Sequence, residues 1–343
     1  MFNRHGLSRS IPDPIKRVIR QRSKFGCVVC RAGIYDYEHI EPEFRDATTH
    51  DPDGICCLCS SCHTKVTRRQ YSKAYVKEKY KEVEAADVAV VPSPYDQLDF
   101  HEGKAELKIG GISYDPGVSS VVNYHGQEIF SISPSNGVET AGISALFLDN
   151  DGNKTLRIQD NVWQGAMEAW DTEVVGPRIK VRKKKGMFAV VLRLEPPGRI
   201  VVERLDMRIG NAHILVSETS YAVGRYNDKK DIYWFHATMA HMGQPMAGAS
   251  AIEFLTDYEA EWRDQQWKDR RTGMRMATPN DQLVIQTGLG VANKPLGIII
   301  GAKCLHFGFG QLASGGPRNL GKMRQLVFNA PDKVAEYIGT GTY

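Results

Sequence analysis

The spacing of apolar residues predicts a helical beginning for the chain and a strand-rich remainder. Asp13 followed by Pro14 is a typical helix start, because aspartate caps free backbone amides and proline fits the first turn. Ile15 and Ile19 then share one face of a helix that should end near Arg22. Short strands and turns are expected between residues 24 and 41.

Two more helices are expected in the first quarter of the chain. One should begin near Ser60 and include Cys62 and His63. Ser72 should cap a third, lysine-rich helix that reaches about Glu84. The three helices and the short strands together indicate a small mixed module over residues 1–85.

From about residue 100 onward, the pattern changes to short apolar runs separated by turn sequences. The runs cover residues 129–132, 145–148, 179–182, 188–194 and 200–205, and the turns include residues 150–153, 176–177 and 196–198. Runs of this length and spacing are typical of an all-β sandwich, barrel or short solenoid. The sequence leaves the choice among these three open.

The predicted fold class is therefore α+β, with a mixed N-terminal module followed by a mostly β domain. The proline-containing stretch at residues 86–99 is expected to be a linker. Residues 100–255 form the predicted β-rich domain. Residues 256–343 are a mixed segment that either extends the β domain or packs elsewhere, with a polar helix expected at residues 258–271.

Composition indicates an ordinary globular protein. The 343 residues are 42% hydrophobic and 24% charged, which suits a chain of two or three domains. The longest apolar run, at residues 296–302, is far too short to cross a bilayer, and the basic N-terminus has no apolar segment behind it. We therefore expect a cytoplasmic protein that has no membrane partner.

Positive charge is concentrated in the first quarter of the chain. Residues 1–85 hold sixteen Lys and Arg against eleven Asp and Glu, an excess of five, whereas the whole chain has a net charge of +4. Such clusters either neutralise DNA phosphates or form solvated helix faces, and charge alone does not decide between the two. The candidate DNA-contacting residues are Arg20, Arg22, Lys24, Lys65, Arg68 and Arg69.

The cysteines give a more specific signal. Six of the seven lie between Cys27 and Cys62, in a chain without a secretory signal, which favours metal binding over disulfide bonds. Two CxxC pairs, Cys27 with Cys30 and Cys59 with Cys62, can supply four thiolates in a tetrahedron. We expect a structural Zn²⁺, because four cysteine ligands leave no open position for a substrate.

Acidic and histidine residues accompany this cysteine frame. Glu38 and His39 lie between the two pairs, and His63 follows Cys62 directly. In order and spacing, residues 15–70 resemble the HNH endonucleases, a family of ββα-metal nucleases in which CxxC, acidic-His-Ile-x-Pro and Leu-Cys-x-x-Cys-His segments recur. The matching positions are Cys27, Cys30, Glu38, His39, Ile40, Pro42, Leu58, Cys59, Cys62 and His63.

The resemblance implies that the ββα-metal module hydrolyses phosphodiester bonds in DNA with one divalent cation. His39 would be the general base, because a neutral imidazole can accept a proton from water. Glu38 and His63 would hold Mg²⁺ or Mn²⁺, which suits one carboxylate, one imidazole and several waters. A surface Glu-His dipeptide without such a role is the plainer alternative.

One position departs from the family pattern. Where the family carries an asparagine that orients the catalytic histidine, this chain has Gly54, which has no side chain for that purpose. Asp53 is the candidate substitute and a candidate catalytic residue, with His50 and Asp51 as alternatives in the same loop. If none of them substitutes, the chain would carry a catalytically silent, zinc-stabilised DNA-binding module.

The predicted function is an HNH endonuclease whose β-rich domain serves target recognition, regulation or assembly, in a setting such as restriction or phage defence. The alternatives are the silent DNA-binding module and a structural, phage-associated protein. DNA is the expected partner, and the sequence leaves open whether the chain forms a homo-oligomer.

Overall fold

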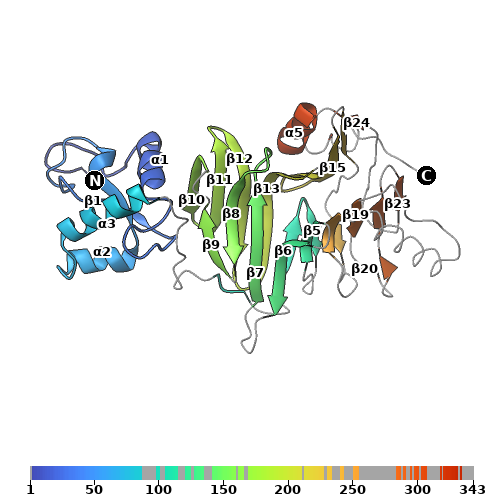
Figure 1. Ribbon diagram of the computed structural model, residues 1–343, viewed down its shortest axis with the longest axis horizontal. Helices are drawn as coiled ribbons and strands as arrows, with labels where there is room; N and C mark the ends of the chain where they lie inside the picture. The colour runs from blue at the N-terminus through green and yellow to red at the C-terminus, as the bar shows by residue number, and fades with distance from the viewer. Residues whose placement is uncertain are drawn as a thin grey trace.

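The chain folds into a small mixed part at the N-terminus and a long β-rich part beside it, as Figure 1 shows for a computed structural model. The structure describes residues 2–86, 98–100, 105–114, 120–124, 127–134, 141–159, 161–165, 169–210, 212–227, 230–233, 240–242, 250–254, 283–286, 289–290, 294–295, 297–300, 303–306, 317–318, 320–330 and 333.

Helices and two short strands make up the N-terminal part. They are α1 (Asp13–Arg22), β1 (Asp36–His39), the 3-10 helix η1 (Pro52–Gly54), β2 (Ile55–Leu58), α2 (Ser60–Thr67) and α3 (Lys73–Ala85). β1 and β2 pair antiparallel, so that Glu38 lies opposite Cys56 and His39 lies opposite Ile55. The order is that of two strands followed by a helix, with α1 before them and α3 after.

The three predicted helices are confirmed, with one difference at the start of the first. α1 ends at Arg22 as expected, but it begins one residue early, with Pro12 at the cap position. The Ser72 hydroxyl accepts a hydrogen bond from the Tyr75 amide at 3.0 Å and caps α3. The Cys59 sulfur caps α2 in the same way, so a metal-ligand candidate also fixes a helix start.

β2 is buried along its whole length because helices cover both of its faces. Ile55 and Cys57 pack with Ile19 of α1, whereas Cys56 and Leu58 belong to a second cluster that contains Val76 of α3. Side chains alternate across a strand, so neighbouring residues meet different helices. Cys56 and Cys57 are completely buried and are core residues of the N-terminal part.

The β-rich part contains two large sheets and a helix among its described residues. The strands are β3 (Glu106–Ile109), β4 (Ile112–Tyr114), β5 (Ser120–Tyr124), β6 (Gln127–Pro134), β7 (Ala141–Leu148), β8 (Lys154–Gln159), β9 (Val162–Gly165), β10 (Asp171–Val175), β11 (Arg178–Lys184), β12 (Met187–Glu195), β13 (Arg199–Ile209), β14 (Ala212–Val216), β15 (Tyr221–Asn227), β16 (Lys230–Tyr233), β17 (Ala240–Met242), β18 (Ser250–Phe254), β19 (Leu283–Gln286), β20 (Leu289–Gly290), β21 (Lys294–Pro295), β22 (Gly297–Ile300), β23 (Lys303–His306) and β24 (Pro317–Arg318). The helix is α5 (Leu320–Asn329).

Both large sheets are mainly antiparallel. Within the described ranges, one sheet has eleven strands, in the order β10-β11-β12-β13-β14-β15-β16-β24, with β3, β4 and β17 joined to it through β13. The other has nine strands, in the order β23-β22-β19-β18-β5-β6-β7-β8-β9. Parallel pairs occur between β3 and β13, β4 and β17, and β5 and β18. β19, β22 and β23 come from the C-terminal segment, which therefore extends the nine-stranded sheet.

The two sheets pack face to face over a shared apolar core. Ile143 and Phe147 of β7 belong to the same buried cluster as Val190 and Leu192 of β12. Burial along β7 alternates from Ala141 to Phe147, as expected for a strand with one face on the core. Neither sheet closes on itself, so of the three predicted β architectures the described strands form a sandwich (Figure 1).

α5 covers the outer face of the eleven-stranded sheet at β14. All five residues of β14 are buried, because one face meets the other sheet and the opposite face meets α5. Val327 of the helix is fully buried, and Phe328 stacks under the Arg204 guanidinium at 4.0 Å. No helix in the described part of the chain is long and apolar enough to span a membrane.

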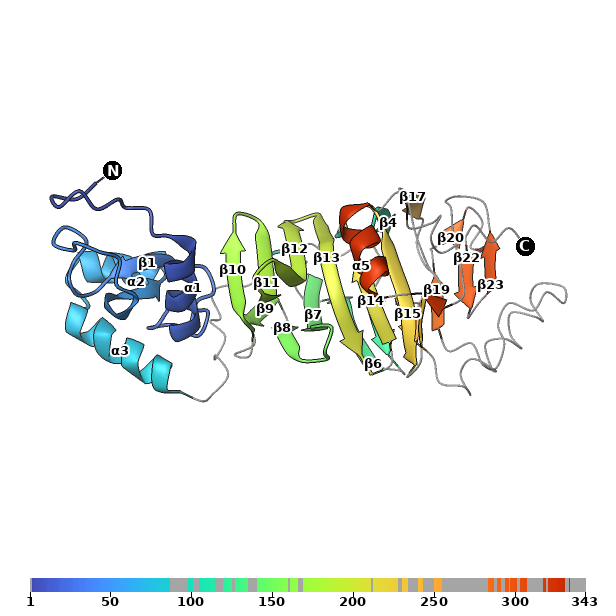
Figure 2. The same cartoon turned by 90° about the horizontal axis from the view of Figure 1, so that it is seen from above.

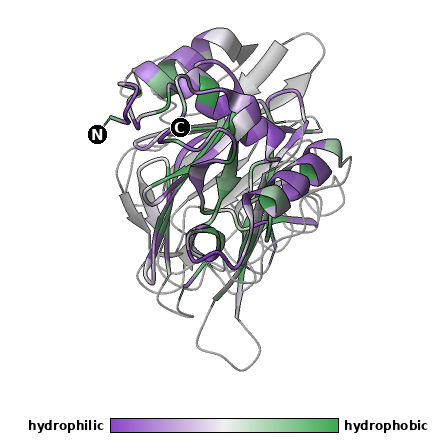
Figure 3. Cartoon of the chain, turned by 90° about the vertical axis from the view of Figure 1, so that its left-hand side faces the viewer, coloured by the Kyte–Doolittle hydropathy of each residue, from purple (hydrophilic) through white to green (hydrophobic). Residues whose placement is uncertain are grey.

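The N-terminal part lies at one end of the sandwich, where α1 meets the edge strand β10 (Figures 1 and 2). Seen from that end, the hydrophobic positions gather on the strands, whereas the helices are largely hydrophilic (Figure 3). The α+β class and the five predicted strand runs are confirmed. Most of the predicted linker, and the helix expected at residues 258–271, lie outside the described residues.

Candidate active site and metal centre

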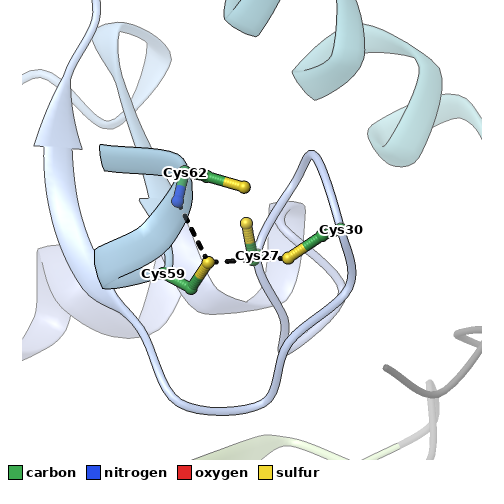
Figure 4. A group of neighbouring side chains, drawn as sticks. All are labelled: Cys27, Cys30, Cys59 and Cys62. Atoms are coloured by element: carbon green, nitrogen blue, oxygen red, sulfur yellow. Dashed lines mark hydrogen bonds between the residues drawn. The ribbon is translucent and has the colours of Figure 1, made fainter. Parts of the chain in front are cut away.

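Four cysteines meet between the loop after α1 and the start of α2 (Figure 4). The sulfurs of Cys27, Cys30, Cys59 and Cys62 all lie within 4.8 Å of one another. Four sulfurs bound tetrahedrally to zinc at about 2.3 Å would be about 3.8 Å apart. The donor set and its spacing therefore fit a zinc ion, and the residues predicted as its ligands are brought together.

Tight local turns build this cluster. The Arg31 amide donates to the Cys27 carbonyl at 2.9 Å, and the Cys27 amide donates to the Ala32 carbonyl at 2.8 Å. The Cys62 amide donates to the Cys59 sulfur at 3.4 Å, the geometry expected around a sulfur that carries negative charge. A hydrogen bond from Cys59 lowers the pKa of Cys27 to about 5, whereas the same contact raises the pKa of Cys59. A cation bound between the sulfurs would offset this effect and favour the thiolate form of Cys59.

Glu38 and His63 form a second pair of candidate ligands, beside the cysteine cluster. Glu38 lies on β1 and His63 on the first turn of α2, and their Oε2 and Nε2 atoms are 3.0 Å apart. Two adjacent ligands of a six-coordinate cation at about 2.1 Å are also about 3.0 Å apart. The Lys73 ammonium, at the start of α3, binds the other Glu38 oxygen. His63 directly follows Cys62, so the cysteine cluster also fixes the position of this imidazole.

His39 lies next to Glu38 at the end of β1 and is largely buried. Its Nε2 atom is 3.2 Å from Nδ1 of His50, and its ring packs on Phe44 with centroids 5.3 Å apart. Burial, assisted by the neighbouring His50, lowers the pKa of His39 to about 4. The ring is therefore neutral at physiological pH, as a general base must be before it accepts a proton.

The peptide of Glu41 explains why the residue at the family's asparagine position is glycine. A Cβ atom on Gly54 would lie 2.1 Å from the Glu41 carbonyl oxygen. The Ile40 amide donates to the Gly54 carbonyl at 2.7 Å, which holds the two segments in this contact. No side chain fits at Gly54 without a backbone shift, so a partner for His39 has to come from another position.

Asp53 does not have the position expected of that partner. Its side chain is 73% exposed and forms an ion pair with Arg22. Among the described residues, the hydrogen-bond partner of the His39 ring is His50, which was the alternative in the same loop. Asp53 points away because it lies in η1, where its carboxylate faces the end of α1.

A groove of about 1140 Å³ contains the candidate catalytic residues Glu38, His39 and His63. Five basic and three acidic residues line it, so the groove has a positive excess suited to a phosphate chain. The basic residues are Arg9, Lys16, Arg45, Arg69 and Lys73.

Among the six predicted DNA-contacting residues, Arg69 is the one that lines this groove. Arg20 is not on a DNA-accessible surface, because it is 4% exposed and bound to Asp171 of β10. Arg22 is held by Asp53 and Glu84. The remaining three lie outside the lining of the groove, Arg68 being exposed and Lys24 and Lys65 partly buried.

Four basic residues of the groove were not among the predicted DNA-contacting residues. Arg9 comes from the N-terminal segment, Lys16 from α1, Arg45 from the loop after β1 and Lys73 from the first turn of α3. These positions show no regular spacing in the sequence, because the fold brings them together. The one local signal is that Lys73 follows the capping residue Ser72, which places it at a helix start.

Comparisons of the chain with family models, with curated proteins and with solved structures gave no match. Within the described part of the chain, three or more potential metal ligands lie together at one place, the cluster of these four cysteines.

Proposed function

We propose that this chain is a metal-dependent, HNH-type endonuclease that hydrolyses phosphodiester bonds in DNA. The observation that carries the proposal is the 3.0 Å separation of Glu38 Oε2 and His63 Nε2 in a groove that also contains His39. A carboxylate and an imidazole at this distance suit one divalent cation, and an adjacent neutral imidazole suits a general base. The order of these residues around the cysteine frame, which resembles the HNH family, supports the same function.

In this proposal, His39 takes a proton from the water that attacks phosphorus. The bond from phosphorus to the leaving oxygen breaks, and that oxygen takes up a proton from solvent. Glu38 and His63 would hold Mg²⁺ or Mn²⁺, which supplies Lewis-acid stabilisation of the phosphate charge. Arg69 would bind a phosphate along the groove.

The cysteine cluster is proposed to hold a structural Zn²⁺. Its sulfurs join the loop after α1 to the first turn of α2, and His63 lies on that same turn. Zinc at this position would stabilise the small N-terminal core and keep His63 opposite Glu38.

The β-rich part is proposed to serve target recognition, regulation or assembly. The β-rich part is attached to the N-terminal part by buried Arg20, which binds Asp171 through two hydrogen bonds of 2.7 and 2.6 Å. This attachment supports a joint role of the two parts. Removal of residues 86–343 would then abolish target preference while leaving some nicking activity.

A second candidate function is that of a catalytically silent DNA-binding module. The observation in its favour is that Lys73 already neutralises Glu38, as a bound cation would. The variant Lys73→Met separates the two functions. For a nuclease, we expect Mn²⁺ affinity to rise about 3- to 10-fold by calorimetry, because a competing charge is removed. A silent module would bind no Mn²⁺ at this site in either form.

The proposed function is tested by cleavage of supercoiled plasmid in Mg²⁺ or Mn²⁺. The wild-type chain should nick or linearise the plasmid, and His39→Ala should lower the rate by about 100-fold or more, because the general base is lost. His5→Ala is the matched control, since His5 is an exposed histidine of the N-terminal segment outside the lining of the groove. It should cleave like the wild type.

Two results would count against the proposal. Cleavage that survives in His39→Ala would place the activity elsewhere. Plasmid that stays intact with every form, on plain and on modified DNA, would favour the silent binding module.

A further inference from the structure

His50 lies between the candidate base and the N-terminal segment. Its Nδ1 atom is 3.2 Å from His39 Nε2, and its Nε2 atom is 2.9 Å from the Ser8 carbonyl oxygen. Both histidines are 9% exposed, so water does not compete freely for these atoms. The two rings and the carbonyl thus form a continuous chain of hydrogen bonds that ends on the backbone.

The Ser8 carbonyl determines the direction of these hydrogen bonds. A carbonyl oxygen can only accept, so Nε2 of His50 must carry a proton. In a neutral His50, Nδ1 is then an acceptor, and the proton of the second bond must belong to His39 Nε2. This leaves the lone pair of neutral His39 on Nδ1.

We infer that His50 is the positioning residue for the catalytic base: it holds His39 in the Nε2–H tautomer and so makes Nδ1 the atom that takes the proton from water. This inference rests on the proposed nuclease function. When His39 takes that proton, its ring becomes positive, and the His50 Nδ1 lone pair stabilises the charge through the existing bond.

The packing around Gly54 explains why a residue of the upstream loop has this role. A side chain at Gly54 would collide with the Glu41 carbonyl, so an orienting group cannot start there. His50 reaches the base from the loop before η1, which is held by the N-terminal segment. Asn3 Nδ2 donates to the carbonyls of Phe44 and Ala47 at 2.6 and 2.7 Å, which holds this segment on the loop.

The N-terminal segment is therefore part of the site. It supplies the Ser8 carbonyl to His50 and the Arg9 side chain to the groove. Asn3→Ala should loosen this arrangement and lower the cleavage rate by a smaller factor than loss of His50, because Asn3 acts two contacts away from the base.

The first test determines the tautomer of His39 directly in the wild-type chain. Histidine-labelled protein is examined by ¹⁵N NMR, and the rings are assigned from spectra of His39→Gln and His50→Asn. We expect His39 to be protonated on Nε2, with a scalar coupling across the hydrogen bond to His50 Nδ1. A His39 ring protonated on Nδ1, or a His50 ring protonated on both nitrogens, would overturn the inference.

The second test measures plasmid cleavage. His50→Ala should lower kcat by roughly 10- to 100-fold with little change in KM, because the base loses its orientation while the DNA-binding groove is unchanged. His50→Asn should recover most of the rate, because an amide oxygen can accept from His39 Nε2. Equal losses in both variants, or an unchanged kcat in His50→Ala, would contradict the role.

The two tests distinguish a failure of this inference from a failure of the proposed function. If wild-type protein cleaves no DNA, the nuclease proposal fails, and with it the catalytic role of His50. If the protein cleaves DNA but His39 carries its proton on Nδ1, the nuclease proposal stands and the role of His50 is wrong.

Discussion

A buried ion pair lies at the contact between the N-terminal part and the sandwich. Arg20 of α1 donates to both oxygens of Asp171 on β10, at 2.7 and 2.6 Å, and to the Tyr37 hydroxyl at 2.6 Å. Arg182 adds a further bond to Asp171 at 3.0 Å. Tyr37 directly precedes Glu38, so the same contact supports the strand that carries the candidate site.

Replacement of Asp171 by asparagine keeps the shape but removes the charge that Arg20 needs. The Arg20 and Asp171 side chains are only 5% and 4% exposed, so water cannot take over the role of the lost carboxylate. Leaving one charge of a buried pair without its partner costs about 3–5 kcal/mol. That is a large share of the roughly 5–15 kcal/mol by which a domain is stable. Glu173, 3.7 Å from Arg20, remains as a longer and more exposed ion pair and offsets only part of this cost.

The free energy of unfolding is measured by urea titration of Asp171→Asn, and hydrogen exchange follows the amides of α1 and β10. We expect a loss of about 3–5 kcal/mol, with faster exchange at both elements. The matched control is Lys79→Ala, which removes an exposed ion pair with Glu82 and should leave the unfolding midpoint near that of the wild type.

A double replacement tests whether the unpaired buried charge causes the loss of stability. Arg20→Met combined with Asp171→Leu removes both charges together and should recover most of the lost stability. A loss below about 1 kcal/mol in Asp171→Asn, or no recovery in the double variant, would refute the argument that an unpaired buried charge sets the cost.

Three further predictions concern the N-terminal part. Gly54→Ala should lower stability by about 1–3 kcal/mol in thermal melts, because its Cβ would meet the Glu41 carbonyl; an unchanged melting temperature would mean that the contact relaxes freely. Purified chain should contain about one zinc per molecule by mass spectrometry, and Cys59→Ser or a strong chelator should remove it and unfold the α2 region in circular dichroism. Arg69→Ala should reduce the salt dependence of DNA binding by about one unit in the log–log slope, whereas Arg68→Ala, beside the groove, should change it less.

Several parts of the site could be predicted from the sequence because they depend on near neighbours. Two CxxC pairs form tight turns by themselves, and the Ser72 cap needs only the amide of Tyr75 three residues later. Glu38 and His63 could be paired because their positions relative to the four cysteines resemble a known nuclease motif. In each case the relevant spacing is a few residues, or is fixed by the four cysteines.

Other parts required the folded chain. Asp53 was the first expected partner of His39, with His50 and Asp51 as alternatives. In the structure, His50 is at hydrogen-bond distance from His39, whereas Asp53 forms an ion pair with Arg22. Arg20 was expected on a DNA-binding face, but the sandwich edge buries it.

The sequence by itself determined the starts of α2 and α3, the cysteine cluster and the residue types of the candidate site. The tertiary structure alone decided which strands pair, which basic residues line the groove and which charges are buried. The physical reason is distance along the chain. Arg20 and Asp171 are 151 residues apart, and only the packing of the sandwich against α1 brings a carboxylate to that guanidinium and excludes water from both.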